Sequence, residues 1–176
     1  MEETNLYSIS IPPMLKALEA LKGVLDKGKK HSDSKKLSWA DFESALLSDR
    51  IIFDQFPLMK QVQVACDNAK GGAARLAEIE IPKFEDTEAT IDELKARIDK
   101  TIAFVKTIKP EQIIGKEAIK VVLPYWEDKH MTGFDYVTQY LMPNFYFHAT
   151  TAYTILRKNG VDVGKSDFAG GLPLKG

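Results

Sequence analysis

The residue with the clearest chemical potential is His148, which lies in the segment PNFYFHATTAYTIL. It falls on the same helical stripe as the apolar residues Leu141 and Ile155, so a helix would turn its imidazole inward. Asn144 stands four residues before it, and Tyr140 stands one turn earlier still. Because side chains at i and i+4 meet on one face of a helix, we expect these three polar residues to point to one place.

A second polar pair, Gln63 and Asp67, has the same spacing in an earlier segment, beside another apolar stripe. If the two helices face each other, one binding pocket would be lined by Gln63, Asp67, Tyr140, Asn144 and His148. Histidines and carboxylates on facing helices are the usual way in which a helical bundle builds a metal site. If any metal binds here, its ligands would be His148 and Asp67.

Three roles are open for His148, and we favour that of a hydrogen-bonded core residue. A small-molecule pocket comes next, and a metal site comes last because one imidazole and one carboxylate make a thin ligand set. No cofactor is therefore expected, with a divalent metal as the alternative. In a cofactor-free enzyme, His148 would be the catalytic general acid–base, oriented by Tyr140 or Asp67.

Aromatic residues crowd the segment around this histidine, and we favour core packing over pocket lining as their role. They are Tyr140, Phe145, Tyr146, Phe147 and Tyr153. Cys66 lies on a buried stripe and is expected to be an inert core thiol. No phosphate-binding loop, dinucleotide fingerprint, zinc-protease motif or nucleophile elbow is present in the sequence.

The composition excludes several classes of function. The chain has 176 residues, with 24 Lys and Arg against 25 Asp and Glu, and a net charge of −1. That balance does not attract nucleic acid or an anionic membrane, and no apolar run reaches the ~20 residues of a membrane-spanning helix. The lone cysteine excludes an internal disulfide and suits a reducing compartment. We therefore expect one cytoplasmic domain that spans residues 1–176.

Four long segments have helical periodicity, which predicts an all-α four-helix bundle. The helices are expected at Pro12–Lys27, Asp54–Ala77, Thr90–Lys109 and Thr132–Gly160, with a short additional helix at Ser38–Leu46. A short extended segment is expected at 116–123, before the last helix, and the tail 161–176 is expected to be irregular.

Local signals refine these elements. Thr90 with Glu93, and Thr132 with Asp135, are expected to form capping boxes, and Pro143 predicts a kink or a restart at Met142. The polar stretch GKKHSDSKK is expected to be an exposed connection, whereas the small residues of CDNAKGGAARLA would let a neighbouring helix approach closely. Phe134 is expected on the buried stripe of the last helix, and Arg97 on a wetter face of its own helix.

Three segments together resemble the DinB/YfiT-like helical-bundle superfamily, in an uncharacterised branch. They are CDNAKGGAARLA, TIDELKARIDKTIAFV and TGFDYVTQYLMPNFYFHATTAYTILRKNGV, and the similarity extends from about Tyr7 to Phe168. The resemblance implies a four-helix bundle of up-down-down-up topology, commonly a homodimer. It also implies, for better-known members, a divalent metal held by three histidines, with thiol-dependent transferase or isomerase activity in some.

Only one of those three histidine positions is matched in this chain. His148 corresponds to the later member of the pair on the last helix, and Asn144 stands where the earlier histidine would be. The second helix has no histidine, and Gln63 or Asp67 is its nearest polar substitute. The sequence therefore favours a small-molecule-binding or scaffolding bundle with a degenerate metal site, with a small hydrophobic ligand and a second copy as expected partners. The alternative is an enzyme, either a metal-dependent transferase or isomerase or a cofactor-free acid–base catalyst that uses His148.

Overall fold

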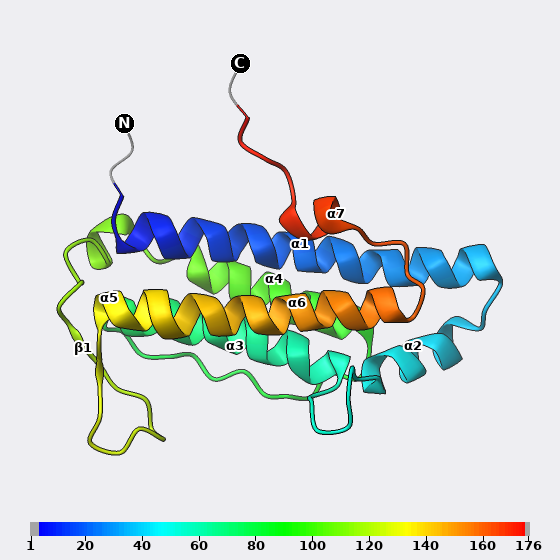
Figure 1. Cartoon of the computed structure of the whole chain (residues 1–176), viewed down its shortest axis with the longest axis horizontal. Helices are drawn as coiled ribbons and strands as arrows, with labels where there is room; N and C mark the ends of the chain where they lie inside the picture. The colour runs from blue at the N-terminus through cyan, green and yellow to red at the C-terminus, as the bar shows by residue number, and fades with distance from the viewer. Residues whose placement is uncertain (1–3, 175–176) are drawn as a thin grey trace.

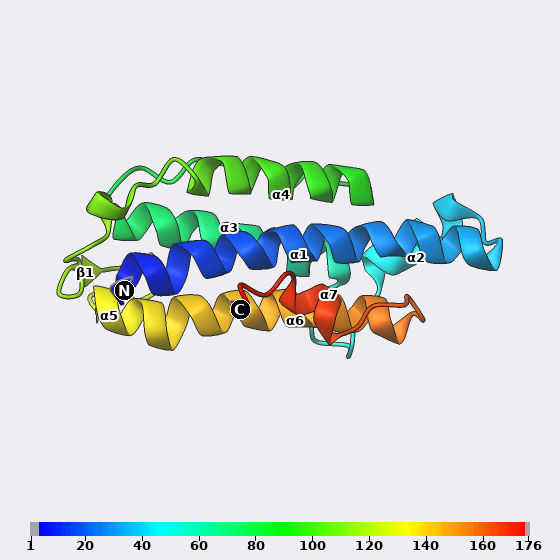
Figure 2. The same cartoon turned by 90° about the horizontal axis from the view of Figure 1, so that it is seen from above.

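The computed structural model describes residues 4–174 and is mostly helical, with one two-stranded sheet (Figures 1 and 2). Its elements in chain order are α1 (Leu6–Lys35), α2 (Trp39–Ser48), α3 (Leu58–Leu76), α4 (Ile91–Val105), the short 3-10 helix η1 (Pro110–Gln112), β1 (Lys120–Val121), β2 (Met131–Thr132), α5 (Gly133–Asp135), the π-helical segment η2 (Tyr136–Leu141), α6 (Met142–Lys158) and α7 (Lys165–Ala169). No helix within residues 4–174 is both long and apolar enough to cross a membrane.

The helices α1, α3, α4 and α6 lie side by side along the long axis of the molecule (Figures 1 and 2). Helix α3 packs against both α6 and α4, and α1 packs against the same two helices from another side. Figure 1 shows α1 and α6 running in one direction and α3 and α4 in the other. The core between them is apolar and fully buried, and includes Leu18, Leu25, Val62, Ile98 and Phe145.

The parallel arrangement of α3 and α4 requires the chain to return along the whole length of α3. The segment 77–90 makes this return as an extended connection that crosses the molecule (Figure 1). An extended chain advances ~3.3 Å per residue against 1.5 Å in a helix, so this short segment can span the 19 residues of α3. Polar side chains of this return segment therefore come to lie against α3 and α4.

Helix α1 is longer at both ends than the sequence pattern predicts. It begins at Leu6 because Asn5 and Ser8 form a capping box, in which the Asn5 side chain accepts a hydrogen bond from the Ser8 amide at 3.0 Å. It continues to Lys35, so the stretch GKKHSDSKK is mostly exposed, as expected, but it is helical and the expectation of a connection was wrong. Gly28 and Ser32 are buried there and extend the stripe of larger apolar residues.

The start of the last helix follows its sequence signals in part. Thr132 is the N-cap and accepts a hydrogen bond from the Asp135 amide at 3.1 Å, and α6 begins at Met142 directly before Pro143. The π-helical turn η2 precedes it, in the region where the proline nitrogen cannot donate to the preceding turn. The wider turn changes the phase of the buried stripe, so Phe134 is 51% exposed, contrary to expectation, and Tyr136 is buried instead.

The segment before the last helix forms a small hairpin, in which Lys120 pairs with Thr132 and Val121 with Met131 in an antiparallel register. The tail is more ordered than expected, because α7 lies against α1 and its Phe168 ring packs on Tyr153 at 5.7 Å. Residues 175–176, which belong to the expected irregular tail, lie outside the described residues.

Candidate functional site

His148 lies on α6 at its contact with α3 and is 9% exposed. Its Nδ1 atom is 2.7 Å from Oε1 of Gln61, and Nε2 of Gln61 donates to the carbonyl oxygen of Phe56 at 2.9 Å. Because the Gln61 amide donates to that carbonyl through its nitrogen, its oxygen must accept from His148. This assignment places the proton on Nδ1 and leaves the Nε2 lone pair of His148 unprotonated.

The environment of His148 also determines its charge. Burial lowers the pKa of His148 below its ordinary value of 6.5, because the charged imidazolium is the form that desolvation disfavours. The imidazole is therefore neutral near pH 7 and donates to Gln61. It is an inward-facing, hydrogen-bonded histidine, as the first of the three expected roles requires.

A second polar pair lies between the same two helices. Asn144 on α6 donates through Nδ2 to Oδ1 of Asn68 on α3 at 3.3 Å. Among the described residues, Nδ2 of Asn68 is buried without a hydrogen-bond partner. The side of α3 that faces His148 and Asn144 thus carries two amides and no carboxylate.

Gln63 and Asp67, which were expected to join His148, face a different neighbour. Nε2 of Gln63 donates to Glu88 at 2.8 Å, and Oδ1 of Asp67 lies 3.0 Å from Nη2 of Arg97 on α4. Residues two apart on a helix point about 200° away from each other, so Gln61 and Gln63 face opposite sides of α3. The expected common pocket is therefore not formed.

Tyr140 is also separate from His148. Its hydroxyl is hydrogen-bonded to that of Tyr125 from the hairpin, and its ring packs edge-on against Trp126 at 5.2 Å. Burial, together with the hydrogen bond from Tyr125, raises the pKa of Tyr140. Neither Tyr140 nor Asp67 orients His148; Gln61 does.

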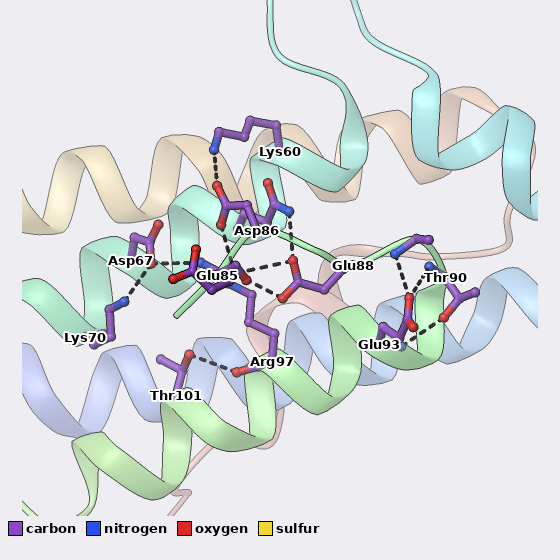
Figure 3. Close-up of polar contacts among 12 residues, drawn as sticks. Lys60, Asp67, Lys70, Glu85, Asp86, Glu88, Thr90, Glu93, Arg97 and Thr101 are labelled. Carbon is purple, nitrogen blue, oxygen red and sulfur yellow. Dashed lines mark hydrogen bonds and ion pairs between the residues drawn. The ribbon is translucent and has the colours of Figure 1, made fainter. Parts of the chain in front are cut away.

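The most extensive polar cluster of the molecule surrounds Arg97, as Figure 3 shows. The Arg97 side chain is only 2% exposed and forms ion pairs with Asp67 at 3.0 Å, Asp86 at 2.9 Å and Glu88 at 3.0 Å. Two cations complete the cluster: Lys70 binds Asp67 at 3.1 Å and Lys60 binds Asp86 at 2.6 Å. Three positive charges therefore balance three negative ones.

This Arg97 cluster joins α3, the return segment 77–90 and α4. The expectation that Arg97 lies on a wetter face was wrong, although the sequence contains a usable signal. Arg97 stands three residues after Leu94 and four before Thr101, both buried, so it lies on the buried stripe of α4. Its partners Asp86 and Glu88 come from an extended segment whose position no helical periodicity indicates.

The charges of the cluster affect each other's protonation. Burial alone would raise the pKa of Asp86, but the hydrogen bond from Lys60 and the charge of Arg97 lower it overall. Burial alone would lower the pKa of Arg97, but the carboxylates of Glu88 and Asp67 raise it overall. Both shifts favour the charged forms of Asp86 and Arg97, which suits this ion pair to holding the return segment against α4.

Cys66 is fully buried on α3, and burial raises its pKa to about 12. A thiol that is protonated and inaccessible is neither a nucleophile nor a metal ligand at neutral pH. The thiol is buried in the core, as the sequence pattern indicates.

The residues around His148 do not fit a divalent metal. Within residues 4–174, no group of three or more His, Cys, Asp or Glu side chains is placed to hold a metal ion. The nearest polar neighbours of His148 and Asn144 are the amides of Gln61 and Asn68, which are poor ligands for transition metals. Asp67, the second expected ligand, is bound by Arg97 and Lys70 on the other side of α3.

The surface carries several open depressions of about 190 to 480 Å³. The largest of them, about 480 Å³, lies between α1, α6 and α7, and its wall includes Pro12, Pro13, Ala17, Tyr146 and Phe168. Lys16 also lines this depression. In none of these five depressions, within residues 4–174, is His148 part of the wall.

Comparison with solved structures places this architecture among DinB-like helical proteins. The crystal structure of a DinB family member protein from Shewanella denitrificans is 38% identical and superposes with a TM-score of 0.90, covering 97% of this chain and 95% of that one. Residues 6–169 match the family model of a domain of unknown function, DUF1993. The chain belongs to this DUF1993 family, which confirms the DinB-like resemblance of the sequence. A comparison with curated proteins found no match.

Proposed function

We propose that this protein is a single-domain four-helix bundle of up-down-down-up topology that binds a small molecule or scaffolds a partner, and that its metal site is degenerate. The observation that carries the proposal is the hydrogen bond from His148 to Gln61, which is itself anchored on the Phe56 carbonyl. Amide side chains of α3 occupy the positions that face His148 and Asn144, so hydrogen bonds between side chains, in place of metal ligands, connect α3 and α6 here.

Metal content tests the first half of the proposal. The protein would be expressed without chelator and then exposed to Zn²⁺, Ni²⁺ or Mn²⁺, and bound metal would be measured by elemental analysis. We expect far less than one metal ion per chain, with no difference between the wild type and His148→Ala. Stoichiometric metal that is lost in His148→Ala would contradict the proposal.

The depression between α1, α6 and α7 supports binding of a small hydrophobic molecule. Its wall is mainly apolar, and its volume of about 480 Å³ lies within the range of ligand sites. Lys16 forms no ion pair with another residue of the 4–174 region, so its ammonium is open to an acidic group on the ligand. A small apolar molecule with one anionic group is the ligand class that this combination favours.

A fluorescent probe with that chemistry, anilinonaphthalene sulfonate, tests the second half. We expect saturable binding to the folded protein that weakens severalfold in Phe168→Ala and in Lys16→Ala. Phe134→Ala is the matched control, because Phe134 is an exposed aromatic residue away from this depression. Binding that is absent, or that is equally weakened by all three changes, would argue against this site.

An acid–base enzyme is the second candidate, and one observation favours it. His148 is neutral and retains an unprotonated Nε2, which is the state that a general base requires. In this candidate, Gln61 would orient the ring in place of the expected Tyr140 or Asp67. An activity that His148→Gln abolishes while the fold stays intact would favour the enzyme over the binding protein.

A further inference from the structure

The C-terminal end of α3 carries an arginine, Arg75, that has no counter-ion in the chain. Its side chain is half-buried, and no carboxylate of residues 4–174 forms an ion pair with it. A guanidinium stays charged at every physiological pH, and a partly buried charge without a partner is costly. Arg75 differs in this from Arg97, for which the chain itself supplies three carboxylates.

Gly71, one turn earlier on the same helix, leaves the space that this guanidinium occupies. A Cβ atom added at Gly71 would lie 2.6 Å from Nη1 of Arg75. The Arg75 side chain therefore lies back across the backbone of Gly71, in the direction that helical side chains take. The position of the guanidinium is thus set by α3 itself.

Aromatic residues of two later segments gather at this end of α3. Helix α3 contacts η2, in which the rings of Tyr136 and Tyr140 stack at 5.7 Å. The loop between β1 and β2 adds Tyr125 and Trp126, and Trp126 packs edge-on against Tyr140 at 5.2 Å. In Figure 1 the β1 hairpin lies at the same end of the bundle as α5, which leads into η2. π-helical turns such as η2 are frequent at functional sites.

The hydroxyl groups of these tyrosines are hydrogen-bond donors close to Arg75. Burial raises the pKa of Tyr136 and of Tyr140, and the positive charge of Arg75 only partly opposes this rise, so both phenols keep their protons at neutral pH. The hydroxyls of Tyr125 and Tyr140 share one hydrogen bond, which uses one of their two O–H groups. In the part of the chain that the structure describes, no acceptor takes the other hydrogen.

We propose that Arg75, Tyr140 and the exposed ring of Tyr125 form a binding site for an aromatic carboxylate. A planar carboxylate matches the fork of a guanidinium and also accepts hydrogen bonds from phenol hydroxyls. Tyr125 is 66% exposed, so its ring is free to pack against the ring of the ligand. A phosphate ion would use the same donors but would leave the aromatic surface unused, so an aromatic acid is the better match.

This site goes beyond the proposed function. It shares no residue with the depression between α1, α6 and α7, so either proposal can fail without the other.

Proton NMR of the tryptophan indole N–H groups tests the site, with benzoate as the probe. The chain has two tryptophans, Trp39 on α2 and Trp126 in the hairpin, and Trp39→Phe assigns their signals. We expect benzoate to shift the Trp126 signal saturably, in the millimolar range that suits so small a ligand, and to leave the Trp39 signal unchanged. Benzamide, which has a similar shape without the charge, should bind at least about 10-fold more weakly.

Two substitutions separate the charge of the guanidinium from its position. Arg75→Gln should weaken benzoate binding at least about 10-fold, because it removes the charge-assisted hydrogen bonds. Gly71→Ala keeps the charge but displaces the guanidinium, and should weaken binding severalfold. Its new methyl group meets only the end of a flexible side chain, so the fold stays intact. Arg50→Gln is the matched control, since it removes an equal charge from the exposed connection between α2 and α3 and should keep the wild-type constant.

Three outcomes would overturn the proposal. The first is a Trp126 signal that benzoate does not shift, and the second is a shift that benzamide produces at the same concentration. The third is a wild-type dissociation constant in Arg75→Gln or, if that variant does not fold, in Gly71→Ala.

Discussion

At the scale of single residues, His148 illustrates how one hydrogen bond can define the role of an ionisable group. Its imidazole contacts an amide, not a carboxylate, and so no neighbouring negative charge stabilises the imidazolium. Burial therefore dominates, and the pKa of His148 falls. A carboxylate at the position of Gln61 would reverse this balance.

The substitution Gln61→Glu tests this explanation of the His148 pKa. In the wild type, a proton NMR titration should give His148 a pKa below 6.5, and Gln61→Glu should raise it, because the new carboxylate would accept from the imidazolium. The change Gln63→Glu is the matched control, since Gln63 faces Glu88 of the return segment, on the opposite side of α3, and should leave the titration of His148 unchanged. Equal shifts in both variants would show that His148 responds to overall charge only.

The lowered pKa also makes the free energy of unfolding depend on pH. Below about pH 6.5 the unfolded chain binds a proton at His148 before the folded chain does, so the stability falls as pH falls, until the folded protein also becomes protonated. Urea unfolding between about pH 7.5 and pH 5 should show this loss. The slope should be shallower in His148→Gln, which cannot titrate, and an unchanged slope would assign the pH dependence to other groups.

At the scale of elements, the N-termini of the helices differ in whether the N-cap side chain accepts a hydrogen bond from the first turn. Thr90 accepts from the Glu93 amide at 3.2 Å and completes a capping box, whereas Ser38 at the start of α2 makes no side-chain capping hydrogen bond. The sequence predicts an N-cap at both positions, with the clearer signal at Thr90, and the structure shows that only Thr90 makes the bond.

This difference predicts unequal effects of two similar substitutions. Thr90→Ala should lower the free energy of unfolding by about 1 kcal/mol, because it removes the acceptor for an otherwise unpaired amide. Ser38→Ala should change it by less than about 0.5 kcal/mol, because no such bond is lost. Urea unfolding of both variants measures the difference, and equal losses would contradict it.

The small residues of α3 are explained by the close approach of the last helical segment. A Cβ atom added at Gly72 would clash with Cδ1 of Leu141 and would lie 3.0 Å from its Cγ, and Leu141 is itself fully buried. The expectation that this stretch admits a close neighbour is confirmed at this position. The glycine pair does not break the helix, because α3 continues to Leu76.

Two glycine substitutions should therefore change stability in opposite directions. Gly72→Ala should destabilise the protein by about 1 to 3 kcal/mol through overpacking against Leu141, despite the better helix propensity of alanine. Gly23→Ala, where a Cβ meets nothing within 4 Å, should stabilise α1 by about 0.5 to 1 kcal/mol. Thermal or urea unfolding distinguishes the two, and a stabilising Gly72→Ala would mean that Leu141 can move aside.

At the scale of the whole molecule, the Arg97 cluster determines how the return segment lies on the bundle. One guanidinium contacts Asp67 on α3 and Asp86 and Glu88 on the segment 77–90, and it also donates to the Glu85 carbonyl at 3.1 Å. These bonds join parts of the chain that share no apolar stripe (Figure 3). They attach the extended connection to α3 and α4 at several points.

Removal of this guanidinium should have a large effect. Arg97→Met should lower the free energy of unfolding by about 3 kcal/mol, because it leaves partly buried carboxylates without their cation. Lys22→Met is the matched control, since Lys22 pairs with the exposed Asp99 and its loss should cost less than about 1 kcal/mol. If the two variants unfold at the same urea concentration, the cluster does not hold the return segment.

Much of the fold could be predicted from the sequence, because periodicity and capping act over short distances. The stripes of the four long helices, the capping box of Thr90 and the restart at Met142 depend on residues within one or two turns of each other. Errors occurred where small or polar residues are buried, as at Gly28 and Ser32 of α1, or where the helical period changes, as at Phe134. In both cases the burial of the residue depends on which helix packs against it, and the local sequence pattern carries no information about that neighbouring helix.

The sequence by itself determined that this chain forms amphipathic helices of the DinB-like kind and that it retains an inward-facing histidine. Only the tertiary structure decided what that histidine meets. Gln61 and Gln63 are the same type of residue and lie two positions apart on α3. The orientation of α3 about its axis nevertheless points Gln61 towards His148 and Gln63 towards Glu88. This orientation is set by the packing of α3 against both α4 and α6, because the apolar faces of all three helices must be buried at the same time. No single segment of the sequence determines it.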